Sequence, residues 1–156
     1  LSTLKGLMMS SGKPAVGVSS LAALALNVGS TDQTIGSVMD AGRGQVYLAY
    51  YQYKSIGALT EMGAEMALAP QKIGEHNQYG EVVYVGDGAV KYRDDILHQV
   101  GKSVRIADED HQFIHASAVA MLAREKFLRH DVLDVNGCLP IYLRSADVWP
   151  KKQILP

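Results

Sequence analysis

Two apolar segments joined by a glycine-rich connection, at residues 35–53, constrain the fold of this chain most strongly. Residues 35–39 and 45–53 are rich in strand-forming side chains, and the connecting residues 40–44 (DAGRG) combine Asp with Gly as hairpin turns do. Residues 82–85 form a continuous apolar run, typical of a strand covered on both faces, and a helical pattern begins at residues 86–88. A hairpin followed by strands that alternate with helices predicts an α/β fold with a mixed sheet flanked by helices.

The remaining periodicity predicts further elements around this centre. Apolar residues at helical spacing, with Ser caps, a Pro in a first turn or Gly stops, predict helices at residues 1–11, 21–27, 70–75, 86–98 and 114–128. Short apolar runs predict strands at residues 13–18, 62–67 and 104–106, and an extended segment at residues 139–143.

Composition excludes several classes of protein. With 47% hydrophobic residues and a net charge of −1, the chain is neither disordered nor basic enough to bind nucleic acid non-specifically. It has no run near the roughly 20 apolar residues of a membrane span. Cys138 is the only cysteine, so no internal disulfide forms, and we expect it to be a buried filler. Without a signal-peptide pattern, we expect a cytoplasmic protein, and the start at Leu1, without Met, predicts an N-terminally shortened chain.

His111 and His115 have the i, i+4 spacing with which two imidazoles share a metal on one helix face. Gln112 occupies the place of the Glu that a zinc protease uses as a base, and the acidic residues 108–110 equally suit the start of a helix. We therefore expect a solvated helix start here and no metal ligands. We also identify no nucleophile, no carboxylate pair and hence no catalytic residue.

Two glycine-flanked loops are candidates for contact with a nucleotide. Gly86 and Gly88 lie between a strand and a helix, where backbone N–H groups can hold a phosphate. Asp40 could approach a phosphate-bound magnesium ion, and Arg43 could pair with an anion. The alternative for both loops is a tight turn that uses Gly and Asp for their backbone preferences.

The first helix carries an apolar stripe. Leu1, Leu4, Leu7 and Met8 share one face, and the small Gly6 permits another helix to approach closely. Met side chains adapt to different surfaces. The stripe is explained equally well by an internal core and by an interface with a partner protein.

Five segments, in order along essentially the whole chain, together resemble the TsaB (YeaZ) family of bacterial tRNA threonylcarbamoyladenosine biosynthesis proteins, which is glycoprotease-like. They are residues 1–7 (LSTLKGL), 13–21 (KPAVGVSSL), 40–47 (DAGRGQVY), 85–89 (VGDGA) and 140–144 (PIYLR). The resemblance implies an actin-like ATPase architecture of two RNase H-like lobes. Residues 1–32 would then be the remnant of a largely missing first lobe, and residues 33–156 the second lobe with a C-terminal tail.

The resemblance also implies a function. Members of this family support the TsaD transferase, which modifies the adenosine beside the anticodon of tRNA, and resemble an enzyme that has lost its chemistry. We therefore expect a non-catalytic scaffolding subunit whose partners are a TsaD-like paralogue and a TsaE-like ATPase, with a homodimer through the same apolar helix face. The expected interface is Leu1, Leu4, Gly6, Leu7 and Met8. tRNA would be contacted indirectly, and ATP or ADP with Mg would bind at the interface of the complex. The alternative is a nucleotide-binding ATPase or a glycoprotease-like hydrolase of the same fold.

Overall fold

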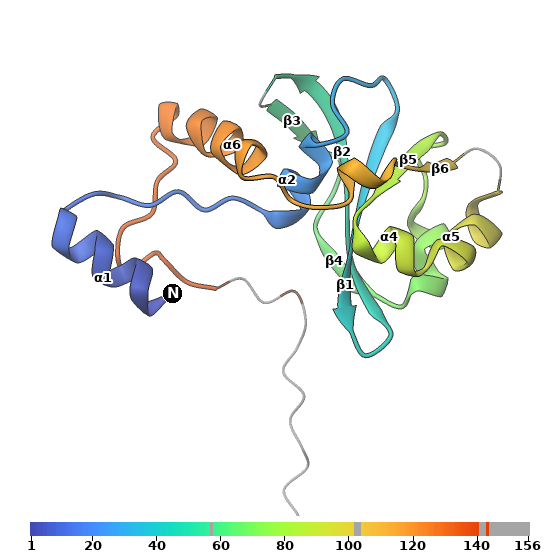
Figure 1. Cartoon of the computed structure of the whole chain (residues 1–156), viewed down its shortest axis with the longest axis horizontal. Helices are drawn as coiled ribbons and strands as arrows, with labels where there is room; N and C mark the ends of the chain where they lie inside the picture. The colour runs from blue at the N-terminus through green and yellow to red at the C-terminus, as the bar shows by residue number, and fades with distance from the viewer. Residues whose placement is uncertain (57, 102–103, 141–142, 144–156) are drawn as a thin grey trace, which may run out of the picture.

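The computed structural model describes residues 1–56, 58–101, 104–140 and 143. Its centre is a mixed sheet of six strands in the order β3-β2-β1-β5-β6, with β4 paired to β2 (Figure 1). The strands are β1 (Thr34–Gly42), β2 (Gln45–Ser55), β3 (Ala58–Glu61), β4 (Met66–Leu68), β5 (Val82–Val85) and β6 (Val104–Ile106). β1 pairs antiparallel with β2 and parallel with β5, as β5 does with β6. The predicted α/β fold with a mixed sheet is confirmed, and the strand order is consistent with an RNase H-like lobe.

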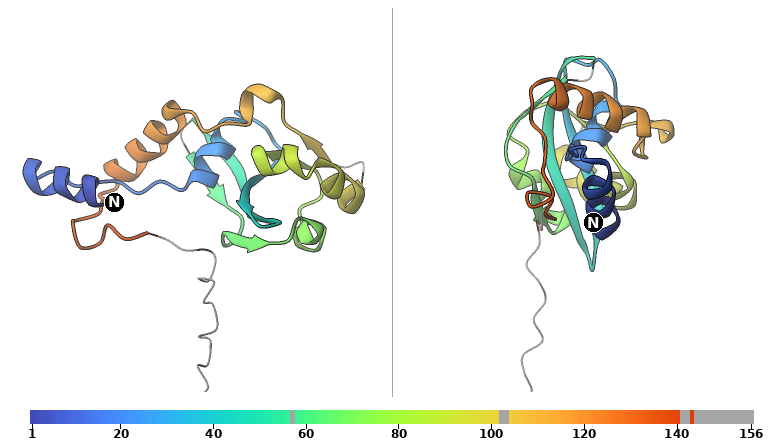
Figure 2. Two further views of the ribbon diagram at one scale, coloured as in Figure 1. Left: turned by 60° about the horizontal axis from the view of Figure 1, so that its bottom comes forward. Right: turned by 90° about the vertical axis from the view of Figure 1, so that its left-hand side faces the viewer.

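Helices cover both faces of the sheet (Figures 1 and 2). The helical elements are α1 (Ser2–Ser11), α2 (Ser20–Leu26), η1 (Pro70–Lys72), α3 (Ile73–His76), α4 (Asp87–Lys91), α5 (Arg93–Val100), η3 (Glu109–His111) and α6 (Ala116–Leu128). α3, α4 and α5 lie on one face, and α2, with α6 behind it, lies on the other. Within the described residues, none of these helices has both the length and the apolar character needed to span a bilayer.

Alternation along the strands builds two cores. Val38 and Tyr84 point toward α3–α5, where Ile73 and Ile96 pack against them. On the opposite face, Leu24 of α2 packs among buried side chains of β1, β2 and β5. α2 thus contributes to the core on this face of the sheet. The division of the chain at residue 32 remains a prediction.

Four predicted elements differ from the structure. Residues 13–18 do not form a strand, because Ala15 finds a single backbone partner, Leu133, with which it exchanges two hydrogen bonds of 3.1 and 2.8 Å. The strand predicted at residues 62–67 was wrong: Gly63, with φ 153°, lies between two short strands, β3 and β4, that pair with different parts of β2.

The helix predicted over residues 86–98 is two helices, because Tyr92 leaves the helical conformation (φ −109°, ψ 29°) and separates α4 from α5. The last predicted helix begins at Ala116 instead of residue 114, so His115 precedes it. Of the extended segment predicted at residues 139–143, residues 141 and 142 lie outside the described residues, as does the tail from residue 144.

Gly36 offers a direct test of how closely the sheet packs. A Cβ atom at Gly36 would lie 2.5 Å from two ring carbons of the fully buried Tyr84. We therefore predict that Gly36→Ala lowers the free energy of unfolding by about 1–3 kcal/mol, the usual cost of overpacking a core. Urea denaturation followed by circular dichroism measures this change.

The matched control is Gly6→Ala in α1, where the added Cβ meets nothing within 4 Å. This variant should not lower stability, because Ala favours a helix over Gly. Equal stability of the two variants would contradict the packing described for Tyr84.

Candidate functional site

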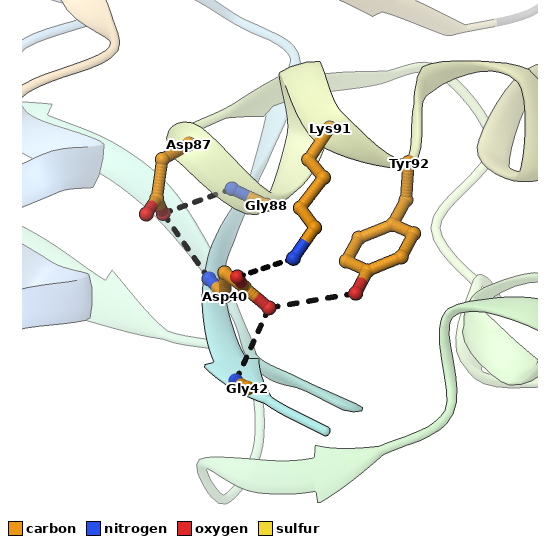
Figure 3. A network of polar contacts seen from close by, with 6 residues as sticks. All are labelled: Asp40, Gly42, Asp87, Gly88, Lys91 and Tyr92. Atoms are coloured by element: carbon orange, nitrogen blue, oxygen red, sulfur yellow. Dashed lines mark hydrogen bonds and ion pairs between the residues drawn. The ribbon is translucent and has the colours of Figure 1, made fainter. Parts of the chain in front are cut away.

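The parallel pairing of β1 with β5 brings together the two loops that the sequence singled out. Ser37 is opposite Val85, so the turn that follows β5 lies beside the last residues of β1. There the Asp40 N–H donates to Oδ1 of Asp87 over 3.1 Å, and the Gly88 N–H donates to the same oxygen over 2.9 Å (Figure 3). Asp40 and Gly88, 48 positions apart, thus share one carboxylate.

The carboxylate of Asp40 is held by three groups. Lys91 Nζ of α4 lies 2.6 Å from Oδ2, and the Gly42 N–H donates to Oδ1 over 3.1 Å. The Tyr92 hydroxyl donates a long hydrogen bond of 3.5 Å to Oδ1, and Lys91 Nζ lies 5.1 Å from the centre of the Tyr92 ring (Figure 3). Asp40 is therefore engaged within its own lobe.

These contacts shift both charged groups in the direction that favours the ion pair. The hydrogen bond from Lys91 is the main cause that lowers the pKa of Asp40, and partial burial opposes it. The same hydrogen bond is the main cause that raises the pKa of Lys91. Asp40 is thus ionised and neutralised at neutral pH, in contrast to the perturbed carboxyl groups that serve as general acids.

Gly86 and Gly88 have a packing role that accounts for both of them. A Cβ atom at Gly86, which has φ 117°, would lie 2.2 Å from the carbonyl oxygen of Val38. A Cβ atom at Gly88 would lie 2.9 Å from the carbonyl carbon of Met39. Only glycine permits the start of α4 to lie this close to β1.

The backbone amides proposed for phosphate already have acceptors. The buried Gly86 N–H donates to Oε1 of Gln112 over 2.6 Å, and Gly88 N–H donates to Asp87 as described. These hydrogen bonds do not favour phosphate binding by this chain alone. Nucleotide contact at Asp40, Arg43, Gly86 and Gly88 remains a prediction.

Arg43 occupies the tip of the β1–β2 hairpin. Gly42 pairs with Gln45, so Arg43 and Gly44 form the two-residue turn, with φ values of 54° and 71°. Positive φ at both positions is the type I′ turn that matches the twist of a hairpin. The turn explanation of this loop thus has a geometric basis.

Gln112 is a structural residue that sequence reasoning missed. Besides accepting from Gly86, its buried amide donates to the carbonyl oxygens of Ala107 and Asp108, the latter over 3.2 Å. One side chain therefore connects the chain after β6 to the turn after β5. A single Gln among acidic residues carried no signal for this role.

The two histidines of the HxxxH spacing do not share a helix face. His111 ends η3 and His115 is the N-cap position of α6. Among the described residues, no group of three or more His, Cys, Asp or Glu side chains is placed to hold a metal ion. Cys138 is buried, as predicted for a filler.

Four of the predicted interface residues lie on α1 and Leu1 is its N-cap, and α1 is set apart from the sheet (Figure 2). Leu1, Leu4 and Leu7 expose 57%, 41% and 62% of their surface. Gly6 has open space around it, whereas Met8 is buried. The exposed apolar surface of α1 thus comprises the three leucines and Met9, and Met8 faces the protein.

Comparison with known proteins agrees with this fold. The family described as "TsaD: tRNA N6-adenosine threonylcarbamoyltransferase" matches residues 1–151. The chain is 32% identical over 140 residues to the tRNA threonylcarbamoyladenosine biosynthesis protein TsaB of Bacillus subtilis, and 30% identical over 155 residues to that of Escherichia coli. The chain belongs to the TsaB/YeaZ family.

The aligned segments cover 88% and 94% of this chain but 59% and 64% of these two members of the TsaB/YeaZ family. YeaZ from Pseudomonas aeruginosa has a similar structure, with a TM-score of 0.75 at 23% identity. The likeness covers 91% of this chain and 65% of that one. A second Pseudomonas aeruginosa structure, of a protein with similarity to peptidase YeaZ, gives the same TM-score and identity. These structures confirm the fold.

The Asp40–Lys91 pair predicts how stability depends on pH. The lowered pKa of Asp40 means that its contribution is present above the carboxyl pKa of the unfolded chain, near 4. That contribution is lost as the pH falls through the lower pKa of the folded state. Lys91→Met removes the main cause of the shift, so its deficit in unfolding free energy should be largest at pH 7 and shrink toward pH 3. Urea denaturation at a series of pH values measures this.

Lys54→Met provides the control, because Lys54 is exposed on β2 and forms no ion pair among the described residues. Its pH profile should parallel that of the unaltered chain. A Lys91→Met deficit that stays constant from pH 7 to pH 3 would contradict the assigned ion pair.

The role of Gln112 is testable by removing its amide. Gln112→Leu leaves the buried Gly86 N–H without its acceptor, so we predict a loss of about 1–3 kcal/mol in unfolding free energy. Gln52→Leu, at an exposed position of β2, should be close to neutral. Thermal and urea unfolding compare the two variants, and equal stabilities would refute the role given to Gln112.

Proposed function

We propose that this chain is a non-catalytic subunit in the formation of threonylcarbamoyladenosine in tRNA, where it supports a TsaD-type transferase. Its membership of the TsaB/YeaZ family and the names of its curated relatives support this pathway. Because the chain spans less than two thirds of those relatives, the proposal concerns what this lobe and its first helices contribute to the assembly.

The geometry of the site favours a structural role for these residues over a catalytic one. The Asp40 carboxylate is paired with Lys91, and the amides of Gly86 and Gly88 already donate to side chains of the same chain. A carboxylate that takes up a proton must be available to it, and an amide that holds a phosphate must have its N–H free to donate. Asp40 instead pairs with Lys91 and so joins β1 to α4, and the Gly86 amide joins the turn after β5 to the chain after β6.

The observation that carries the proposal is the exposed apolar surface of α1. Leu1, Leu4 and Leu7 present adjacent leucine side chains to solvent on a helix that lies away from the sheet. Large adjacent apolar side chains on a surface mark sites of protein association. With a net charge of −1, the chain suits a protein partner better than the phosphates of tRNA, which it would contact indirectly.

Three partners are considered for this assembly: a TsaD-type transferase, a second copy of this chain and a TsaE-like ATPase. The TsaD-type transferase is the first partner, because the family whose model matches the chain is named for that transferase. A related protein can present to this chain the equivalent face that a second copy presents in a two-fold dimer. A second copy of this chain would compete for the same leucines. A TsaE-like ATPase would then join the assembled pair, with ATP or ADP and Mg at their interface.

The test is to mix this chain with the TsaD-type transferase of the same organism and follow the complex by size-exclusion chromatography and calorimetry. Leu7→Asp should weaken association by about tenfold or more, because it buries a charge in an apolar interface. Val90→Asp is the matched control: Val90 is also an exposed apolar residue on a helix, at 51%, but lies on α4.

Failure of the unaltered chain to bind the transferase would contradict the proposed function. Equal binding by the Leu7→Asp and Val90→Asp variants would show that α1 is not the interface. Light scattering of the chain alone reports whether a second copy occupies the surface, and a dimer that the transferase fails to displace would also count against the proposal.

A further inference from the structure

A groove of about 1080 Å³ lies on the face of the sheet that carries α2. Its lining residues come from α2, α6, β2 and β3 and from the chain that follows α6. Figure 1 shows where these elements lie. Tyr47, Leu59 and Leu122 give it an apolar wall. Its volume is at the upper end of the roughly 300–1,000 Å³ that ligand pockets usually have, so it can hold a peptide segment with a large side chain.

Acidic side chains give the groove a negative charge. Four carboxylates and two cations line it. Lys126 lies 3.1 Å from Asp131, and Arg129 lies 3.7 Å from Glu125, so these four charges balance.

Two further glutamates line the groove, Glu61 and Glu65. Neither Glu61 nor Glu65 has an ion-pair partner in the part of the chain that the structure describes. Glu65 is fixed in place because its Oε1 accepts hydrogen bonds from the Ser19 hydroxyl and, over 3.2 Å, from the Tyr51 hydroxyl. The groove is therefore complementary to an apolar segment that carries basic residues.

The sequence supplies such a segment next to the groove. Leu139, Pro140 and Leu143 are themselves part of its lining, and Leu143 packs against the core on this face. The sequence then continues for 13 residues, RSADVWPKKQILP, with three basic residues, one acidic residue and the apolar Trp149. At up to about 3.5 Å per residue, Trp149 is within about 20 Å of Leu143, and no long loop has to close.

We propose that residues 144–156 bind in this groove of the same chain. Trp149 packs against the apolar wall, and Lys151 and Lys152 neutralise Glu61 and Glu65. The segment acts as an intramolecular ligand whose high effective concentration compensates for a small interface. Occupied in this way, the groove adds contacts between α2 and α6 to those of Ala23 and Leu26 with Ala118, and it keeps an apolar surface out of water. This inference does not depend on the proposed function.

The experiment uses the intrinsic fluorescence of Trp149, which is the only tryptophan in the chain. In the full chain we expect a blue-shifted emission maximum and an acrylamide quenching constant about threefold lower than in 8 M urea, because the indole ring is buried. Both values should be independent of protein concentration. High salt should raise the quenching constant, since the glutamate–lysine attraction is partly screened.

Charge reversal locates the binding site. Glu61→Lys should shift the emission to the red and raise the quenching constant, and so should the double change Lys151→Glu with Lys152→Glu. Combining the three substitutions should restore the original values. Glu75→Lys, at an exposed position of α3 on the opposite face of the sheet, is the control and should change nothing. Circular dichroism confirms that each variant is folded.

Several outcomes would overturn the proposal. A Trp149 emission in the unaltered chain that matches the urea-unfolded chain means that the segment does not bind. A buried Trp149 that ignores all charge reversals means that it binds elsewhere. A blue shift that grows with protein concentration means that a second copy provides the segment, or the groove.

Discussion

The close approach of the 86–88 turn to β1 is the contact on which the rest of this lobe depends. The carbonyl groups of Val38 and Met39 lie where side chains at Gly86 and Gly88 would be. This approach places α4 directly over β1, so that Lys91, one turn along, reaches Asp40. It also buries the Gly86 N–H, which then needs the acceptor that Gln112 supplies. The close packing that these two glycines permit thus makes possible both the Asp40–Lys91 ion pair and the hydrogen bonds of the buried Gln112 amide.

The fold could be predicted from the sequence where local pattern and tertiary environment agree. Residues 82–85 are apolar without interruption because β5 is covered on both faces, and Arg43-Gly44 form the hairpin turn that the Asp-Gly-rich loop indicated. Residues 13–18 show the limit: their apolar pattern is that of a strand, but a strand exists only with a neighbour, and Ala15 has one bridge, to Leu133. Tyr92 likewise interrupts a continuous helical pattern, and from this break its hydroxyl reaches Asp40.

The sequence predicted several residues of the candidate site but not the hydrogen bonds and the ion pair that they form. Asp40, Gly86 and Gly88 were recognisable as loop residues beside strands, and the parallel pairing of β1 with β5 brings them together. Nothing in the sequence indicates that Lys91 neutralises Asp40 or that Gln112 occupies the Gly86 amide, because both depend on how far α4 and the chain after β6 approach the sheet. With these contacts made, Asp40 and the Gly86 amide stabilise the fold, whereas the sequence alone presented them as possible ligands of a phosphate.

The distribution of apolar surface follows from the same arrangement. The sheet buries its apolar side chains against α2 on one face and against α3–α5 on the other. By contrast, α6 buries Ala118 and leaves exposed Val119, Met121, Phe127 and Leu128. α1 likewise buries Met8 and exposes its leucines. Both helices lie on the same side of the molecule, beyond α2 (Figure 2). A lobe whose polar cluster is internally neutralised and which exposes apolar side chains along α1 and α6 is built to be completed by other protein surfaces. The groove that α6 lines is where that completion can begin within the chain itself.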